Sequence, residues 1–204
     1  LLKHIEQMEQ HKEDFVKRPF RDFSRNTKLS FQNTIMSLIS MERSSITSEL
    51  QKFFNFSVDT PTSSAFVQQR DKLLPVAFQH LFYAFSKEFH PQYNGFNIFA
   101  VDGSDILIPL EKENKAYSYF HRKVQQNYHQ IHLNAVYNLM NNQYVAAYIE
   151  PRKWHNERNA FHHLFDEHSF APDSVFIFDR GYEGYPLMAH IASKGQFFLI
   201  RAKD

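Results

Sequence analysis

The sequence has 204 residues, 43% of them hydrophobic, and its 22 phenylalanines and 10 tyrosines are ample for a packed core. It contains no cysteine, which excludes disulfide scaffolds, zinc–thiolate sites and a cysteine nucleophile. The net charge of +1 does not by itself indicate a nucleic-acid-binding protein. No apolar run approaches the roughly 20 residues of a membrane-spanning helix, so we expect a cytoplasmic protein without a membrane partner.

The first part of the chain, residues 1–90, has the spacing of amphipathic helices. Phe31, Ile35, Leu38 and Ile39 fall on one face of a helix. A second helix is expected behind a cap at Ser44–Ser45, and a third begins at Ser63 after a turn. Pro75 opens a further helix, whose expected inward side chains are Phe78, Leu81, Phe82 and Phe85.

Two features of this helical region suggest contact with DNA. Two short helices joined by a turn resemble a helix–turn–helix, and the second would expose Gln68 and Arg70. A cluster of cations, opposed only by Asp22, could neutralise phosphates; it consists of Lys17, Arg18, Arg21, Arg25 and Lys28. The alternatives stay open: an ordinary helical bundle with a wet polar face, and a solvated basic surface.

The second part of the chain, residues 91–204, has the pattern of a mixed α/β sheet. Short apolar runs alternate with helical segments in the order strand, strand, strand, helix, strand, helix, strand. The expected strands are 97–101 (followed by a short run at 106–108), 129–137, 144–149, 175–178 and 196–200, and the expected helices are 157–168 and 183–193.

Two carboxylates are candidates for catalysis because each follows a buried strand. Asp102 follows residues 97–101, and Asp179 follows residues 175–178. If the two strands are neighbours, the acids meet at one edge of the sheet. Close carboxylates repel unless a cation bridges them, and aspartate oxygens suit Mg²⁺ or Mn²⁺. The competing interpretation is that each aspartate only ends a strand at a turn.

The residues around these acids resemble a known family. The segment from Phe99 to Ser104, with Ile108–Pro109, is similar to the first-aspartate motif of DDE transposases of bacterial insertion sequences, in the insertion-sequence-four branch. The segment from Phe178 to Tyr182 is similar to the second-aspartate motif. The resemblance covers about residues 96–204, whereas residues 30–90 match it only in helical character.

The resemblance implies a ribonuclease-H-like fold and a two-metal mechanism. Asp102 and Asp179 would be the first two catalytic acids and would bind Mg²⁺ or Mn²⁺. Water would attack the transposon end, and the freed 3′-hydroxyl would attack target DNA. Arg180, beside the second acid, would contact a phosphate. The implied partners are transposon ends, target DNA and a second copy of the chain, in a cytoplasmic, nucleoid-associated complex.

The sequence departs from the family pattern at its end. The family takes its third acid, a glutamate, from a later helix within a Tyr-Arg-Glu-Lys signature, and the chain stops at Asp204 without that spacing. The sequence also begins Leu1–Leu2, without an initiator methionine. We therefore expect a truncated transposase that is nearly inactive by itself. The alternatives are a catalytically idle DNA-binding remnant and a ribonuclease-H-like nuclease.

Weaker signals each have a plain structural interpretation. Asp105 would point to the opposite pleat from Asp102 and is expected to be a structural or a surface residue. The group around His162 and Asp166 is expected to be a solvated helix face, and Asn156 a helix cap. Trp154 is expected in the core, although it could stack on an unpaired base. The segment that holds Lys112 and Lys123 could touch the DNA backbone.

Overall fold

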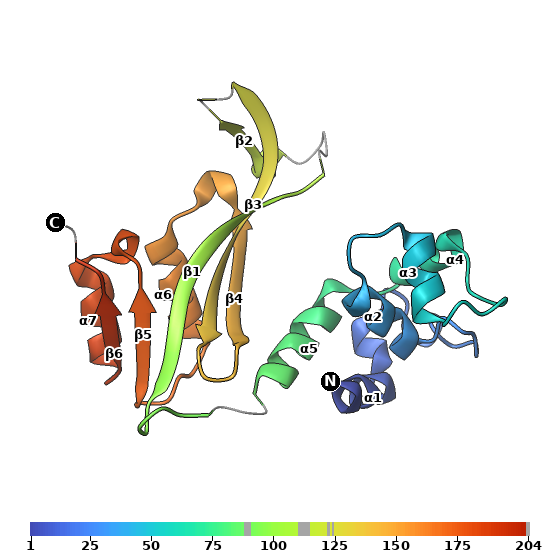
Figure 1. The fold of residues 1–204 in the computed structure, drawn as a ribbon, viewed down its shortest axis with the longest axis horizontal. Helices are drawn as coiled ribbons and strands as arrows, with labels where there is room; N and C mark the ends of the chain where they lie inside the picture. The colour runs from blue at the N-terminus through green and yellow to red at the C-terminus, as the bar shows by residue number, and fades with distance from the viewer. Residues whose placement is uncertain (88–90, 110–114, 122, 124, 203–204) are drawn as a thin grey trace. The chain divides into compact units, whose positions relative to one another are not determined.

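The computed structural model describes residues 1–87, 91–109, 115–121, 123 and 125–202. The chain divides into two compact units, Leu1–Phe85 and Ser86–Asp204 (Figure 1). The boundary lies a few residues before the one predicted at residue 90. Among the described residues, none of the helices has the length and apolar character needed to cross a lipid bilayer.

The first unit is helical, as predicted. Its elements are α1 (Leu2–Gln10), η1 (Lys12–Phe15), α2 (Phe31–Ser40), α3 (Ile46–Phe53), α4 (Ser63–Arg70) and α5 (Pro75–Ser86). Three of these helices begin at a hydroxyl side chain that accepts a hydrogen bond from the backbone N–H three residues later: Ser30, Ser45 and Thr62. Such caps satisfy amide donors that a helix leaves unpaired at its first turn.

The core of the first unit joins α1, η1, α2 and α5. Phe31 is fully buried and meets Phe23 edge-to-face at 5.7 Å between ring centroids. The prediction that Phe78 and Phe85 point inward is wrong, since these side chains are 36% and 37% exposed. Ile39, at the edge of the apolar face of α2, is 45% exposed. The apolar faces of α2 and α5 are wider than the part of each helix that this small core buries.

The second unit is built on a sheet of six strands. Its elements are β1 (Asn97–Leu107), η2 (Lys115–Tyr117), β2 (Ser118–His121), β3 (Gln126–Asn138), β4 (Gln143–Pro151), η3 (Arg152–Trp154), α6 (Glu157–Glu167), β5 (Ser174–Phe178), η4 (Arg180–Tyr182), α7 (Tyr185–Ser193) and β6 (Phe197–Ile200). The strands lie in the order β4-β3-β1-β5-β6, and β2 pairs with the first residues of β3. β1 is antiparallel to β3 and parallel to β5, which gives the predicted ribonuclease-H-like mixed sheet.

The first strand differs from the prediction. The two runs expected as separate strands, 97–101 and 106–108, form the single strand β1 up to Leu107. Its ladder with β3 continues without a break from Phe99↔Asn138 to Leu107↔Gln130. The Asp102–Gly103 pair therefore does not make a turn, because the partner strand continues past it.

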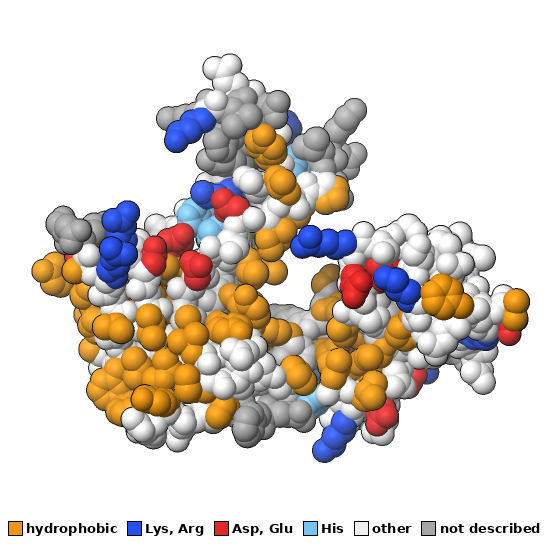
Figure 2. Space-filling view, in the orientation of Figure 1, with side chains coloured by type: hydrophobic (Ala, Val, Ile, Leu, Met, Phe, Trp, Pro, Cys, Tyr) orange, Lys and Arg blue, Asp and Glu red, His pale blue; other side chains and the backbone are white. Residues whose placement is uncertain are grey.

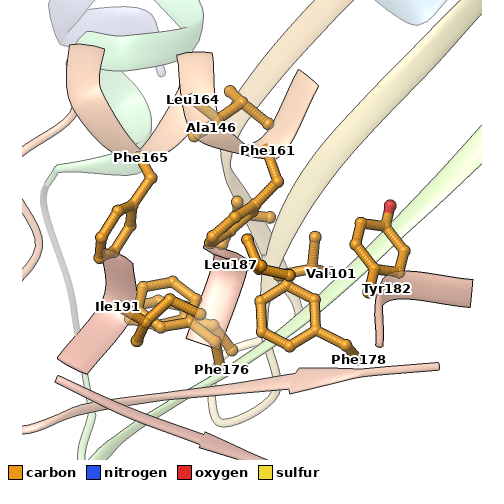
Figure 3. Packing of buried hydrophobic residues seen from close by; sticks show 12 residues of the cluster. Val101, Ala146, Phe161, Leu164, Phe165, Phe176, Phe178, Tyr182, Leu187 and Ile191 are labelled. Carbon is orange, nitrogen blue, oxygen red and sulfur yellow. The ribbon is translucent and has the colours of Figure 1, made fainter. Parts of the chain in front are cut away.

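Helices α6 and α7 pack on one face of this sheet (Figure 1). Phe161 and Phe165 of α6 meet Phe176 of β5 at ring-centroid distances of 5.5 and 5.4 Å, and Ile191 of α7 joins the same cluster (Figure 3). The opposite face shows a broad apolar area with acidic and histidine side chains grouped at its margin (Figure 2). The covered face thus supplies the core of this unit.

We expect Phe176→Ala to lower the free energy of unfolding of the second unit by about 3–5 kcal/mol, because it opens a cavity in this core. Chemical denaturation measures the change. As a control, Ile149→Ala removes a side chain that is 60% exposed, and it should cost less than about 1 kcal/mol. Equal effects of the two substitutions would contradict this description of the core.

Candidate active site

The parallel pairing of β1 with β5 sets the positions of Asp102 and Asp179. The last paired residues of this ladder are Val101 and Phe178, and the two aspartates come directly after them. Neighbouring strands lie about 4.8 Å apart, so the backbones of the two acids are adjacent. Asp179 follows the end of β5 as predicted, whereas Asp102 lies within β1, not at its end.

Each aspartate accepts one hydrogen bond from its own loop or strand. The backbone N–H of Gly103 donates to Asp102 Oδ1 at 2.8 Å, and that of Gly181 donates to Asp179 Oδ1 at 2.8 Å. Asp179 thereby caps η4. Asp102 also lines a pocket of about 490 Å³ on the face of the sheet away from α6 and α7; other lining residues are Ala100, Ser104, Leu133, Ala135, Tyr137 and Tyr144. Asp179 is not among the residues that line it.

A third carboxylate, Glu157, lies beside Asp179. A Cβ atom at Gly181 would lie 3.0 Å from Asp179 Oδ1 and 3.3 Å from Glu157 Oε2, so both oxygens face the same point. Burial raises the pKa of Glu157, and the charges of Asp179 and then Asp102 raise it further. Sequence reasoning missed this residue, because an acid in the first turn of a helix is expected for its dipole alone.

Tyr182 closes the site from the core side. Its ring packs 5.2 Å from that of Phe178, and its side chain is only 1% exposed (Figure 3). Its hydroxyl is buried and has no hydrogen-bond partner among the described residues. Burial raises the pKa of Tyr182, and the neighbouring charges of Glu157, Asp102 and Asp179 raise it further, so the phenol stays protonated and can donate a hydrogen bond.

Two histidines lie next to this group, on the helix side of the sheet. The rings of His132 and His155 are 3.9 Å apart between centroids, and their ligand atoms and those of Glu157 all lie within 4.8 Å of one another. Burial lowers the pKa of His155 to about 4, and the charges of His132 and Arg152 lower it too, so His155 is neutral near pH 7.

Asp105 has the structural role predicted for it. One oxygen pairs with His132 Nδ1 at 2.6 Å, and the other accepts from Arg152 Nε at 2.7 Å. Burial acts to raise the pKa of Asp105, but these two hydrogen bonds and the charges behind them hold it below its ordinary value. Asp105 is directly opposite His132 in the β1–β3 register, which one sequence does not reveal.

The first unit brings five of the residues predicted to contact DNA together. They line one pocket of about 580 Å³, which Lys72 also lines: Arg18, Arg21, Arg25, Lys28 and Gln68. Lys17 instead forms an ion pair with Asp71 at 2.8 Å, and Arg70 is exposed without lining this pocket. Helices α3 and α4 are joined by residues 54–62, a longer connection than the turn of about three or four residues in a helix–turn–helix.

The residues of the second unit that were predicted to contact DNA differ in their exposure. Arg180 and Lys123 are exposed, and Lys112 lies outside the described residues. The prediction that Trp154 is in the core is wrong, since its side chain is 61% exposed. It belongs to η3, which crosses the surface between β4 and α6. Asn156 caps α6 as predicted, and its side chain accepts from Asn159 N–H at 3.2 Å.

The histidines of α6 form a bridge to α7. His162 Nδ1 pairs with His190 Nδ1, and Asp166 accepts from His190 Nε2 at 2.9 Å and from Lys194 Nζ at 2.7 Å. The prediction of a merely solvated helix face is therefore corrected: these groups connect two helices. Burial lowers the pKa of His162, and the charge of His190 lowers it too.

The second unit combines a ribonuclease-H-like sheet with two aspartates at neighbouring positions of adjacent strands, which is the arrangement expected of a DDE catalytic domain. Residues 93–204, more than half of the chain, match the family described as transposase DDE domain, so the chain belongs to that family. Membership of the DDE transposases was expected from the sequence and is confirmed; the insertion-sequence-four branch stays a prediction.

One solved structure to which the chain is similar is described as "Drosophila P element transposase strand transfer complex", with 10% sequence identity and a TM-score of 0.45. The similarity covers 97% of this chain and 48% of that one, so the chain spans about half of its length. No curated protein matches the sequence.

Gly103 is expected to tolerate no side chain, because a Cβ there would lie 2.4 Å from His132 Nε2. We predict that Gly103→Ala lowers the free energy of unfolding by about 1–3 kcal/mol through this overlap. Denaturation of the control Ser104→Ala, at an exposed position, should differ from wild type by less than about 0.5 kcal/mol. Wild-type stability of Gly103→Ala would refute the close approach of His132.

His162 should make the stability of the second unit depend on pH. Its pKa is lowered from 6.5 in the folded chain, so the unfolded chain binds the proton more readily. The contribution of neutral His162 to the free energy of unfolding is complete above pH 6.5, and it is lost as the pH falls toward the lowered pKa of the folded chain. Between pH 7 and pH 5, chemical denaturation should show a smaller decrease in the free energy of unfolding for His162→Gln than for wild type. The exposed neighbour His163 gives a control, His163→Gln, which should keep the wild-type loss.

Proposed function

We propose that this chain is a DNA transposase whose Asp102 and Asp179 hold divalent cations, Mg²⁺ or Mn²⁺, at the reacting phosphate. The observation that carries the proposal is the pairing of Val101 with Phe178, since it makes the two aspartates neighbours. The reaction class is phosphodiester hydrolysis at insertion-sequence ends followed by strand transfer. Membership of the DDE family supports this reaction class.

The donor set fits the proposed ions. Asp102 and Asp179 each use one oxygen for a backbone N–H, which leaves the second oxygen of each carboxylate to bind a cation. Hard divalent cations prefer carboxylate oxygens with water in the remaining positions. When bound, such ions activate the attacking oxygen and stabilise the leaving oxygen of an in-line displacement.

The residues around the two acids have distinct proposed roles. Glu157 adds a third carboxylate beside Asp179. Burial raises its pKa, and the charges of Asp179 and Asp102, which a cation would offset, raise it further. Tyr182 keeps its proton and offers a donor at the edge of the group. Arg180, exposed next to Asp179, is proposed to contact a phosphate of the bound strand.

DNA is the proposed partner of the first unit as well. The pocket lined by Arg18, Arg21 and Arg25 gathers cations within reach of one phosphate backbone. Gln68 on α4 lines the same pocket and has the side chain that reads base edges. We further propose a homodimer in the active complex, because two transposon ends must be joined, and a nucleoid-associated location.

Metal binding tests the catalytic assignment. Asp102→Ala and Asp179→Ala should each weaken Mn²⁺ binding in calorimetry by more than about tenfold, since even residues that only orient ligands contribute that much. The matched control is Glu167→Gln, which removes an exposed carboxylate from α6 and should leave the affinity unchanged. Wild-type affinity in both aspartate variants would mean that the two acids do not hold the ion.

DNA binding tests the assignment of the first unit. Arg18→Ala, Arg21→Ala and Arg25→Ala should each weaken binding of double-stranded DNA in fluorescence anisotropy. Each lost phosphate contact should reduce the slope of log affinity against log salt by about 0.9. Lys3→Ala removes an exposed cation of α1 outside the pocket and should not change the slope. An equal loss of DNA affinity in Lys3→Ala would mean that binding depends only on the net charge of the chain, and would contradict the assignment of the pocket.

A further inference from the structure

We propose that His132, His155 and Glu157 bind a transition-metal ion at a site separate from the Asp102–Asp179 pair. The three side chains come from β3, from the segment between η3 and α6, and from the first turn of α6. Their ligand atoms already lie within 4.8 Å of one another. Metal–ligand distances of about 2.0–2.2 Å place two donors of one ion roughly 4 Å apart or less, so only small shifts are needed.

Two imidazole nitrogens in this cluster lack partners. His132 Nε2 and His155 Nδ1 are buried and have no hydrogen-bond partner among the described residues. His132 is 3% exposed, and its other nitrogen, Nδ1, is already engaged by Asp105. Buried polar atoms are nearly always satisfied. A cation accounts for both orphaned nitrogens at once.

The partner of His132 is of the kind that orients a metal ligand. Asp105 accepts from Nδ1 at 2.6 Å and is itself held by Arg152 Nε at 2.7 Å. This hydrogen bond keeps the proton on Nδ1, which leaves the lone pair of Nε2 without a partner among the described residues. Histidines that bind metals generally donate their other N–H to a carboxylate or carbonyl in this way.

The chemistry and the position of the cluster distinguish it from the aspartate pair. Two imidazoles with one carboxylate suit Zn²⁺ or Co²⁺, whereas Mg²⁺ prefers oxygen ligands alone. His132 belongs to the pleat that faces α6, and Asp102 belongs to the opposite pleat of the sheet. An ion on the histidines would fix Glu157, whose Oε2 faces Asp179 across Gly181.

Visible absorption of Co²⁺ tests the proposal without any DNA reaction. The full chain, freed of metal by a chelator, is titrated with Co²⁺ in excess Mg²⁺, which occupies the oxygen-only site. Wild type should bind one Co²⁺ and show the visible absorption bands of Co²⁺ held by a few nitrogen and oxygen ligands. His155→Ala and Glu157→Gln should each weaken binding by more than about tenfold. Zn²⁺ should displace Co²⁺ and raise the melting temperature of wild type, but not that of His155→Ala or Glu157→Gln.

The controls separate this site from its surroundings. His163→Ala removes an exposed histidine of the same helix and should bind Co²⁺ as wild type does. Asp102→Ala and Asp179→Ala should also keep Co²⁺ binding, so the aspartate site and the histidine site can fail independently. The proposal is overturned if wild type shows no such absorption, if His155→Ala and Glu157→Gln bind normally, or if only the aspartate variants lose the ion.

Discussion

The double pairing of β1 is the constraint on which the second unit depends. On one side β1 runs parallel to β5, and on the other it runs antiparallel to β3. The parallel ladder ends at Val101↔Phe178 and makes Asp102 the neighbour of Asp179. The antiparallel ladder continues and places Asp105 opposite His132. One strand therefore positions both the proposed metal-binding acids and the carboxylate that orients the histidine cluster.

Two glycines leave room for side chains at this corner of the sheet. Gly103 leaves room for the ring of His132, and Gly181 leaves room for the oxygens of Asp179 and Glu157. The N-terminal cap at Asn156 fixes where α6 begins, and so where Glu157 lies. Burial raises the pKa of Glu157, and the negative charge concentrated at this corner by Asp179 and Asp102 raises it further.

Much of this arrangement could be predicted from the sequence, because it depends on local patterns. Partial period-two alternation predicted β3, a short apolar run predicted β5, and the cap with the apolar spacing predicted α6. The continuity of β1 could not be predicted, since an Asp–Gly pair favours a turn unless a partner strand holds it extended. Glu157, His132 and His155 were missed for a related reason: their proximity depends on register and on helix placement, which no spacing along the chain encodes. Trp154 was misplaced because residue type alone favoured burial over the surface position of η3.

The most direct test of the central claim, that Asp102 and Asp179 share a divalent cation, is anomalous diffraction at the manganese absorption edge from crystals grown with Mn²⁺. We expect an anomalous peak between the two carboxylates, within coordination distance of an oxygen of each. A peak elsewhere, or an ion bound by only one of the two aspartates with the other turned away, would contradict it.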